Sequence, residues 1–153
     1  MRATEVILSR RVGVLVEAAR LLRTRHKVRI VFVGTPDPGN PTSVDEAILR
    51  RWEQERLIEY WGWQDDMLAV YQQSHIVVLP SFYEGVPTAL LEAAACGKPL
   101  VATDIPGCRA IVRDGINGFL VPVQDAAALV DALEKLIVDP ALRQKMGLAS
   151  RQL

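Results

Sequence analysis

Two glutamates and the short stretch between them are the residues of this chain whose types and spacing suggest chemistry most directly. Glu84 and Glu92 are separated by seven residues, which include a Pro-Thr pair and the start of an Ala- and Leu-rich run. Because proline is favoured in the first turn of a helix, Pro87 predicts a helix that begins between the two carboxylates. The first amides of a helix lack intrahelical partners and carry the positive end of the helix dipole, so they can hold an anion.

The first amides of this helix, which could bind an anion, would lie between two carboxylates that could accept hydrogen bonds from hydroxyl groups. Glu84 would precede the helix, and Glu92 would lie about one turn inside it near the same mouth, since each helical residue rises ~1.5 Å. The amides could bind a diphosphate, and the carboxylates could accept hydrogen bonds from sugar hydroxyls. A nucleotide sugar carries both kinds of group. The spacing alone fits equally well a Glu84 that only complements the dipole and a Glu92 that is an ordinary solvated residue.

The elements around this stretch alternate between strand and helix patterns. Residues 76–79 are four consecutive apolar residues, which is typical of a strand buried on both faces of a parallel sheet. Gly97, with Pro99 beyond it, is expected to end the helix that follows. Further strands are predicted at residues 5–8, 28–33, 57–61, 100–103 and 119–121, and further helices at 12–25, 44–54, 67–73, 108–113, 126–138 and 140–150.

Side-chain caps are predicted for three of these helices. Thr42 or Ser43 is expected to cap the helix at 44–54, because Glu46 lies three residues beyond Ser43 as in a capping box. Asp65 or Asp66 is expected to cap the helix at 67–73, and an aspartate also precedes the helix at 126–138.

The alternation predicts an α/β fold, a doubly wound and mostly parallel sheet with helices on both faces. In such sheets ligands bind beyond the carboxyl ends of the strands. Gly34, the pair Gly62 and Trp63, Glu84 and residues 104–107 all follow predicted strands. We therefore expect them to converge on one edge of the sheet.

The bulk composition predicts a single domain over residues 1–153. Half of the residues are hydrophobic, which is enough for one core. Eighteen basic and eighteen acidic residues cancel, so no overall field favours nucleic acid. Cys96 and Cys108 are expected to be small buried side chains and not part of a disulfide framework or metal cluster. No signal peptide or membrane-spanning run is recognised, so we predict a cytoplasmic location.

The chain resembles the group 1 glycosyltransferases, which are retaining, nucleotide-sugar-dependent enzymes of the GT-B fold. The resemblance begins with Glu84 and Glu92, which look like the Glu-x7-Glu element of that family. It covers nearly the whole chain from about Val12 onward. The other segments that carry it are residues 79–87, 94–104, 106–109, 114–122 and 139–143, together with Met146 and Gly147.

The resemblance implies that this is the Rossmann-like, donor-binding, carboxy-terminal half of a two-domain GT-B enzyme. Glu84 would be the catalytic-site residue that binds hydroxyls of the transferred sugar, and Glu92 would accept from the ribose hydroxyls. The diphosphate would lie on one short segment, where the N–H groups of the non-proline residues would hold it. That segment consists of Gly85, Val86, Pro87, Thr88 and Ala89.

The resemblance also implies a position for the nucleotide base. This sequence differs from the family pattern at a few positions. Gly34 and the Gly62–Trp63 loop would border the base, and Trp63 would either stack on it or pack into the core. Relatives carry an Arg and a Lys-Gly pair near the domain start, whereas the first eleven residues here are atypical. Arg10 would supply charge to the phosphates or would be simply solvated. Ala110 stands where relatives often carry Glu.

The implied reaction is transfer of a hexosyl unit from a nucleoside diphosphate sugar, with a UDP-sugar expected as donor. The helix start would stabilise the departing diphosphate as its charge develops. The chain contains no Asp-x-Asp sequence, so we expect no catalytic metal and no cofactor. A glycosidase acid/base pair is disfavoured because Glu92 is committed to the helix flank.

The amino-terminal acceptor domain of such enzymes has no counterpart in this sequence. We therefore expect the chain alone to bind a nucleotide sugar weakly and to be inactive or nearly so. The expected partners are the donor, the absent domain and, through the exposed edge left by that domain, a second copy of the chain. Any membrane contact is expected to be peripheral and to run through the absent domain.

Residues 40–43 and 63–67 resemble members of the family that build bacterial surface polysaccharides on lipid carriers. Two other functions remain open at this point. One is half of a nucleotide-sugar epimerase of the GT-B type, and the other is a binding or assembly module without catalysis.

Overall fold

The computed structural model describes residues 4–8, 13–34, 45–80 and 87–153. Within these ranges strands and helices alternate along the chain. The strands are β1 (Thr4–Leu8), β2 (Val28–Val33), β3 (Glu59–Gly62), β4 (Ile76–Leu79), β5 (Leu100–Thr103) and β6 (Gly118–Val121). The helices are α1 (Gly13–Arg23), α2 (Glu46–Gln54), α3 (Met67–Gln73), α4 (Thr88–Ala95), α5 (Pro106–Arg109), α6 (Ala126–Ile137) and α7 (Pro140–Arg151).

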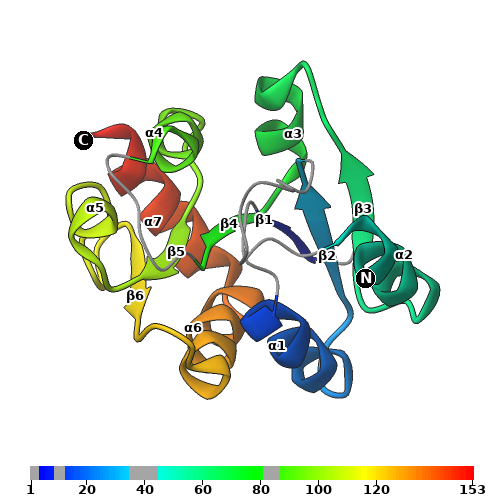
Figure 1. The fold of residues 1–153 in the computed structure, drawn as a ribbon. Helices are drawn as coiled ribbons and strands as arrows, with labels where there is room; N and C mark the ends of the chain where they lie inside the picture. The colour runs from blue at the N-terminus through cyan, green and yellow to red at the C-terminus, as the bar shows by residue number, and fades with distance from the viewer. Residues whose placement is uncertain (1–3, 9–12, 35–44, 81–86) are drawn as a thin grey trace.

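The six strands form one sheet in the order β3-β2-β1-β4-β5-β6 (Figure 1). All five neighbouring pairs are parallel. In the centre Ile7 of β1 is in register with Val31 on one side and Val77 on the other. The carboxyl ends of all strands therefore lie along the same edge, and the predicted parallel α/β sheet is confirmed.

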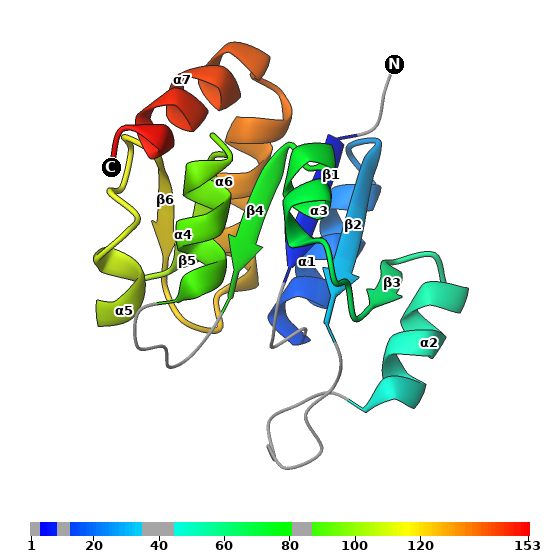
Figure 2. The ribbon, with the colours of Figure 1, turned by 90° about the horizontal axis from the view of Figure 1, so that it is seen from above.

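Helices cover both faces of the sheet. α1 and α6 lie on one face, and α3, α4 and α5 lie on the other (Figures 1 and 2). α2 packs beside β3 at one end of the sheet. α7 lies across the amino ends of the strands and reaches α4 (Figure 2). This is the doubly wound arrangement that the alternation of elements predicts.

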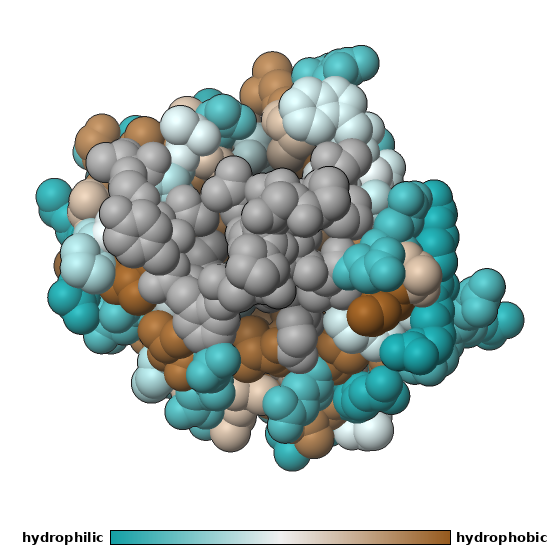
Figure 3. Space-filling model, viewed as in Figure 1, coloured by the Kyte–Doolittle hydropathy of each residue, from teal (hydrophilic) through white to brown (hydrophobic). Residues whose placement is uncertain are grey.

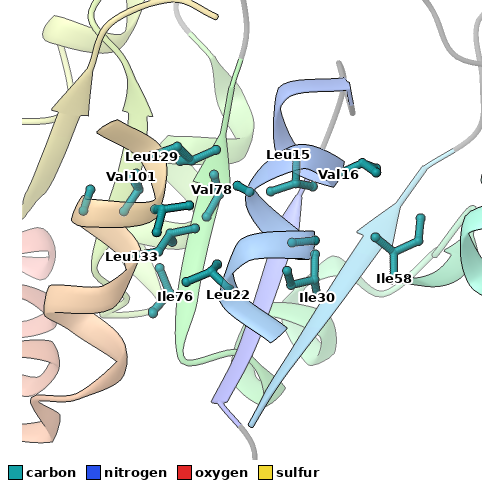
Figure 4. Packing of buried hydrophobic residues seen from close by; sticks show 14 of the residues in the cluster. Leu15, Val16, Leu22, Ile30, Ile58, Ile76, Val78, Val101, Leu129 and Leu133 are labelled. Carbon is teal, nitrogen blue, oxygen red and sulfur yellow. The ribbon is translucent and has the colours of Figure 1, made fainter. Parts of the chain in front are cut away.

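The larger core lies between the sheet and the face formed by α1 and α6 (Figure 4). The apolar stripe of α1 faces this core, and its members recur at the spacing of an amphipathic helix. Leu15, Ala18, Ala19 and Leu22 are all fully buried. A second core lies under α3, α4 and α5 and contains Tyr71, Leu90 and Cys108.

The strand β4 links the two cores, because its side chains alternate between the faces of the sheet. Ile76 and Val78 belong to the first core, whereas Val77 and Leu79 belong to the second. None of the four is more than 3% exposed. The predicted central strand, buried on both faces, is confirmed, and it leads directly toward the segment that precedes α4.

Three local predictions differ from the structure. Asp45 caps α2, with its carboxylate accepting from the Ala47 amide at 3.2 Å, so the Thr42 or Ser43 cap was wrong. Both of those residues lie outside the described ranges. The capping residue is the one directly before the first residue of the helix. Asp45 occupies that position in an extended conformation.

The other two differences concern where an element begins. β3 begins at Glu59 and not at residue 57, because Arg56 has φ 60° and the Leu57 amide donates to the Trp52 carbonyl. This turn closes α2 before the strand can start. α5 spans Pro106–Arg109 and not residues 108–113, because Pro106 supplies the preferred first residue of a helix.

The surface over α2 is strongly polar. Figure 3, in the view of Figure 1, shows hydrophilic side chains gathered there. Arg50 lies 3.5 Å from Glu46 and 3.4 Å from Glu53 on this helix. In the described residues, no helix is both long and apolar enough to cross a bilayer.

The close packing of α4 and α7 predicts that a glycine-to-alanine substitution in α7 destabilises the protein. A Cβ on Gly147 would lie 2.2 Å from the Gly97 carbonyl oxygen at the end of α4. Helix propensity alone predicts that Gly147→Ala stabilises by up to about 1 kcal/mol. We expect overpacking to dominate, so that this variant lowers the free energy of unfolding by about 1–3 kcal/mol in urea titrations.

The matched control for this change is Gln144→Ala on the exposed side of the same helix. It should alter the free energy of unfolding by less than about 0.5 kcal/mol. Stabilisation by Gly147→Ala would contradict the close approach of the two helices.

Candidate functional site at the carboxyl edge of the sheet

The ends of β2 and β3 are joined at the carboxyl edge. The Gly34 amide donates to the Gly62 carbonyl oxygen at 2.8 Å. The φ values are 120° at Gly34 and 70° at Gly62, which side chains rarely permit. The structure thus brings together two of the residues that were predicted to border one end of a ligand.

Trp63 projects from this junction into solvent. Its side chain belongs to a residue that is 70% exposed, and its indole N–H donates to the Asp65 carboxylate at 2.8 Å. Leu68, the second residue of the following helix, is also exposed, at 58%. Core packing was one of two readings of Trp63, and its exposure excludes that reading. An indole face is therefore presented at the edge of the sheet.

The start of α4 differs from the starts of four other helices. Aspartate side chains accept amide hydrogen bonds at the starts of α2, α3, α6 and α7; these residues are Asp45, Asp66, Asp125 and Asp139. At α4 the cap residue is Pro87, and no described side chain accepts there; the four-residue helix α5 also has no side-chain cap. Pro87 is the cap itself, one position before the predicted first turn.

The first amides of α4 lie at the same edge as Gly34 and Gly62, because α4 follows the carboxyl end of β4. The Pro87 carbonyl oxygen accepts the first hydrogen bonds of the helix, from the Leu90 and Leu91 amides. The Thr88 and Ala89 amides come before these residues and so have no acceptor within the helix. Thr88 is exposed and Ala89 is half-buried. The positive end of the helix dipole is thus presented where the strands end.

Glu92 is exposed and is the fifth residue of α4, about 6 Å along the helix axis from its start. This agrees with the predicted position near the mouth of the site. Four predicted site residues, Arg10, Glu84, Gly85 and Val86, lie outside the described ranges. The structure therefore places one of the two carboxylates and the amide donors of Thr88 and Ala89.

Tyr71 of α3 is a buried polar residue beneath α4 that the sequence did not single out. It is 3% exposed and lies in the core beneath α4. Burial raises the pKa of its hydroxyl far above the ordinary value, and the negative charge of the Glu92 carboxylate raises it further. The hydroxyl therefore stays protonated at neutral pH.

An ion pair follows β5 at the same edge. The Arg109 Nε donates to the Asp104 carboxylate at 2.6 Å, and a second guanidinium nitrogen lies 3.3 Å from the Asp104 carbonyl oxygen. The Asp104 amide in turn donates to the Val121 carbonyl oxygen at 2.7 Å. The loop at 104–107 was expected at this edge, but the ion pair was not predicted.

A hollow at the opposite, amino edge contains an ion pair and a carboxylate that already has a backbone partner. It is lined by Arg23, Val28, Arg29, Ile30, Glu53, Arg56, Leu57, Ile58 and Glu59. Arg29 forms two hydrogen bonds to Glu59, at 2.7 and 2.8 Å, and these hold the pKa of Glu59 below its ordinary value. Glu53 accepts from the Tyr60 amide at 2.8 Å. The carboxyl edge is therefore the better candidate for a ligand.

No group of three or more His, Cys, Asp or Glu side chains is placed to hold a metal ion in the described part of the chain. Cys108 is buried, as expected, whereas Cys96, which was also expected to be buried, is only partly buried. The donors at the carboxyl edge are amides, an indole and carboxylates. They suit an anion that carries hydroxyl groups and a flat ring.

The chain is similar in sequence and in fold to known glycosyltransferases. A family model described as "Glycosyl transferases group 1" matches residues 7–139. The chain is 32% identical over 149 residues to the putative glycosyltransferase EpsD of Bacillus subtilis, which covers 97% of this chain and 38% of that protein. It is 31% identical over 131 residues to a Campylobacter jejuni protein, covering 86% of this chain and 33% of that protein.

The Campylobacter relative is named N,N'-diacetylbacillosaminyl-diphospho-undecaprenol alpha-1,3-N-acetylgalactosaminyltransferase. The fold is similar to that of a TarM mutant from S. aureus in complex with fondaparinux, alpha-GlcNAc-glycerol and UDP. That similarity has a TM-score of 0.86 at 22% identity and covers 98% of this chain and 31% of TarM. The chain thus spans about a third of the length of these proteins, and the Rossmann-like prediction of the GT-B type is confirmed.

The exposure of Trp63 predicts how the three tryptophans respond to a neutral quencher. Trp52 and Trp61 are partly buried, so acrylamide should quench chiefly the fluorescence of Trp63. Trp63→Phe should therefore lower the Stern–Volmer constant by about half or more, because it removes the most accessible fluorophore. Trp52→Phe is the control and should raise the average constant. An unchanged constant in Trp63→Phe would contradict the exposed indole.

Proposed function

Because this chain belongs to the group 1 glycosyltransferase family, we propose that it binds the nucleotide-sugar donor of a retaining glycosyltransferase. The observation that carries the proposal is the start of α4. Its amides have no side-chain cap among the described residues, and they share an edge with the exposed Glu92 and Trp63. One nucleotide sugar would use all of these groups together.

The diphosphate would lie on the amides of Thr88 and Ala89. Helix starts bind phosphate because several N–H groups point toward it and the dipole is favourable. In glycosyl transfer the bond to the anomeric carbon breaks, and negative charge grows on the departing diphosphate. Fixed amides that already point at this charge stabilise the transition state more than the ground state.

The nucleoside would lie between α4 and the β3–α3 loop. Glu92 would accept hydrogen bonds from the ribose hydroxyls, and the indole of Trp63 would stack on the base beside Gly34 and Gly62. The fold neighbour TarM was solved with UDP, and this supports uracil as the base. A stacked base would gain about 1–3 kcal/mol from an aromatic platform of this kind.

The transferred sugar would be a hexose whose hydroxyls are held by Glu84. This assignment rests on the family resemblance, since Glu84 lies outside the described residues. The Campylobacter relative is named for transfer onto an undecaprenol diphosphate carrier, which supports a role in the assembly of bacterial surface polysaccharides. We assign this chain the donor half of such a reaction.

The ribose assignment is tested by calorimetric titration of the 153-residue chain with UDP, GDP and ADP. UDP should bind best, and Glu92→Ala should weaken it roughly tenfold, because a hydrogen bond to a charged group contributes about 1.5–3 kcal/mol. Glu17→Ala removes an exposed carboxylate on α1 and should leave binding unchanged. Unchanged affinity in Glu92→Ala would remove the ribose assignment, and no binding of any nucleotide would favour an assembly module.

The phosphate assignment is tested by giving α4 the cap that four other helices have. In Pro87→Asp a carboxylate would occupy the first amides and repel phosphate, so UDP affinity should fall about tenfold or more. Uridine affinity should stay the same. Pro87→Asn, which caps without charge, should have a smaller effect on UDP. Equal UDP affinity in all three proteins would refute binding at these amides.

A further inference from the structure

The loop between β3 and α3 is anchored at both ends, where the chain passes the carboxyl edge (Figure 1). At the end of β3 the Gly34 amide donates to the Gly62 carbonyl oxygen at 2.8 Å. At the start of α3 the Asp66 carboxylate accepts from the Ala69 amide at 3.1 Å. Residues 63–65 lie between these two anchors, so the backbone of this segment is constrained from both sides.

The side chain in the middle of this loop folds back onto the strand. Gln64 is partly buried, and its side-chain amide donates to the Trp61 carbonyl oxygen at 3.0 Å. The side chains before and after it, those of Trp63 and Asp65, meet each other. The indole Nε1–H of Trp63 donates to the Asp65 carboxylate at 2.8 Å, a distance typical of charge-assisted hydrogen bonds.

The two adjacent aspartates of the loop have different partners. Asp65 and Asp66 were both candidates for the cap of α3, and the structure shows Asp66 in that position. The helix start is therefore satisfied without Asp65. The carboxylate of Asp65 is left to accept from the indole of Trp63.

This hydrogen bond matters because the core holds little of the Trp63 ring. Trp63 is 70% exposed, whereas Trp61 packs against a buried cluster of three valines. An exposed side chain retains its rotamer freedom unless a contact selects one orientation, and the bond to Asp65 is such a contact. The indole N–H lies in the plane of the ring, so a partner at this edge leaves both aromatic faces free to stack.

We propose that Asp65 is a positioning residue, whose carboxylate holds the indole of Trp63 in the orientation that stacks on the nucleotide base. Holding the ring before the ligand arrives removes an ordering cost from binding. The carboxylate acts through the indole and needs no contact with the nucleotide. This inference rests on the proposed function, because it assumes that the base stacks on Trp63.

The orientation of the ring is tested without a ligand by NMR of the ¹⁵N-labelled, 153-residue chain. The heteronuclear NOE of an indole N–H reports its motion, and the signal that disappears in Trp63→Phe identifies the Trp63 resonance. We expect a high NOE in the unmodified chain and a much lower one in Asp65→Ala. Asp65→Asn should restore the high value, because the amide oxygen of asparagine still accepts a hydrogen bond. An NOE that stays high in Asp65→Ala would overturn the positioning role.

The effect on binding is tested by calorimetric titration of the same proteins with UDP. Asp65→Ala should weaken binding about threefold to tenfold, as expected for the loss of one hydrogen bond. Asp65→Asn should bind UDP at least as well as the unmodified chain, because it keeps the acceptor and removes a charge that repels phosphate. Equal losses in Asp65→Ala and Asp65→Asn would contradict a role of the acceptor oxygen.

A double variant tests whether Asp65 acts through the indole. Trp63→Ala should weaken UDP binding about tenfold or more, because it removes the stacking platform. Adding Asp65→Ala to Trp63→Ala should then have no further effect. A further loss of similar size to that of Asp65→Ala alone would show that the carboxylate acts by another route and would refute the inference.

Asp66→Ala is the structural control. It removes the cap of α3 at the neighbouring residue, so it should lower the melting temperature and leave the NOE of the Trp63 indole unchanged. If Asp66→Ala and Asp65→Ala lower this NOE equally, Asp65 acts only through the stability of the loop, and the positioning role is wrong.

Two further outcomes separate this inference from the function on which it rests. If Trp63→Ala weakens UDP binding and Asp65→Ala does not, the positioning role is wrong and the stacking assignment stands. If Trp63→Ala leaves UDP binding unchanged, or if UDP does not bind, the stacking assignment and the positioning role both fail.

Discussion

The common direction of the strands is the constraint on which the site depends. Every neighbouring pair in the sheet is parallel, so the chain segments that leave β2, β3, β4 and β5 all emerge at one edge. The strand β4 fixes this arrangement, since its side chains are buried in both cores. The direction of the strands therefore brings three features to the same edge of the sheet. They are the start of α4, the pair Gly34 and Gly62, and the exposed indole of Trp63.

The described helices differ in how their starts are satisfied, and α4 and the four-residue α5 have no side-chain cap. Aspartates satisfy the starts of α2, α3, α6 and α7 from within the chain, and each such cap stabilises by about 1 kcal/mol. The start of α4 gains no such stabilisation from any described side chain. Its other end is held instead, where α7 passes so close that only glycine fits at residue 147. The carboxyl end of α4 is thus packed against α7, whereas its amino end is available to bind a ligand.

The sequence predicted those features that follow from local pattern. Four apolar residues in a row identified β4, and the stripe of α1 identified the face that packs on the sheet. The cap of α2 and the start of β3 were wrong because they depend on which of several neighbouring polar groups forms a hydrogen bond. The burial of Tyr71 was not predicted, because it depends on the packing of elements that are distant in the sequence. The position of Glu84 remains a prediction, as it lies outside the described residues.

The central claim is that phosphate oxygens settle on the first amides of α4, and amide shift mapping by NMR tests it most directly. Titration of the ¹⁵N-labelled chain with UDP should shift the Thr88 and Ala89 amides and the Trp63 indole N–H most strongly, with uridine shifting only the indole. Shifts confined to the amino edge around Arg29 and Glu59, with Thr88 and Ala89 unmoved, would contradict the account.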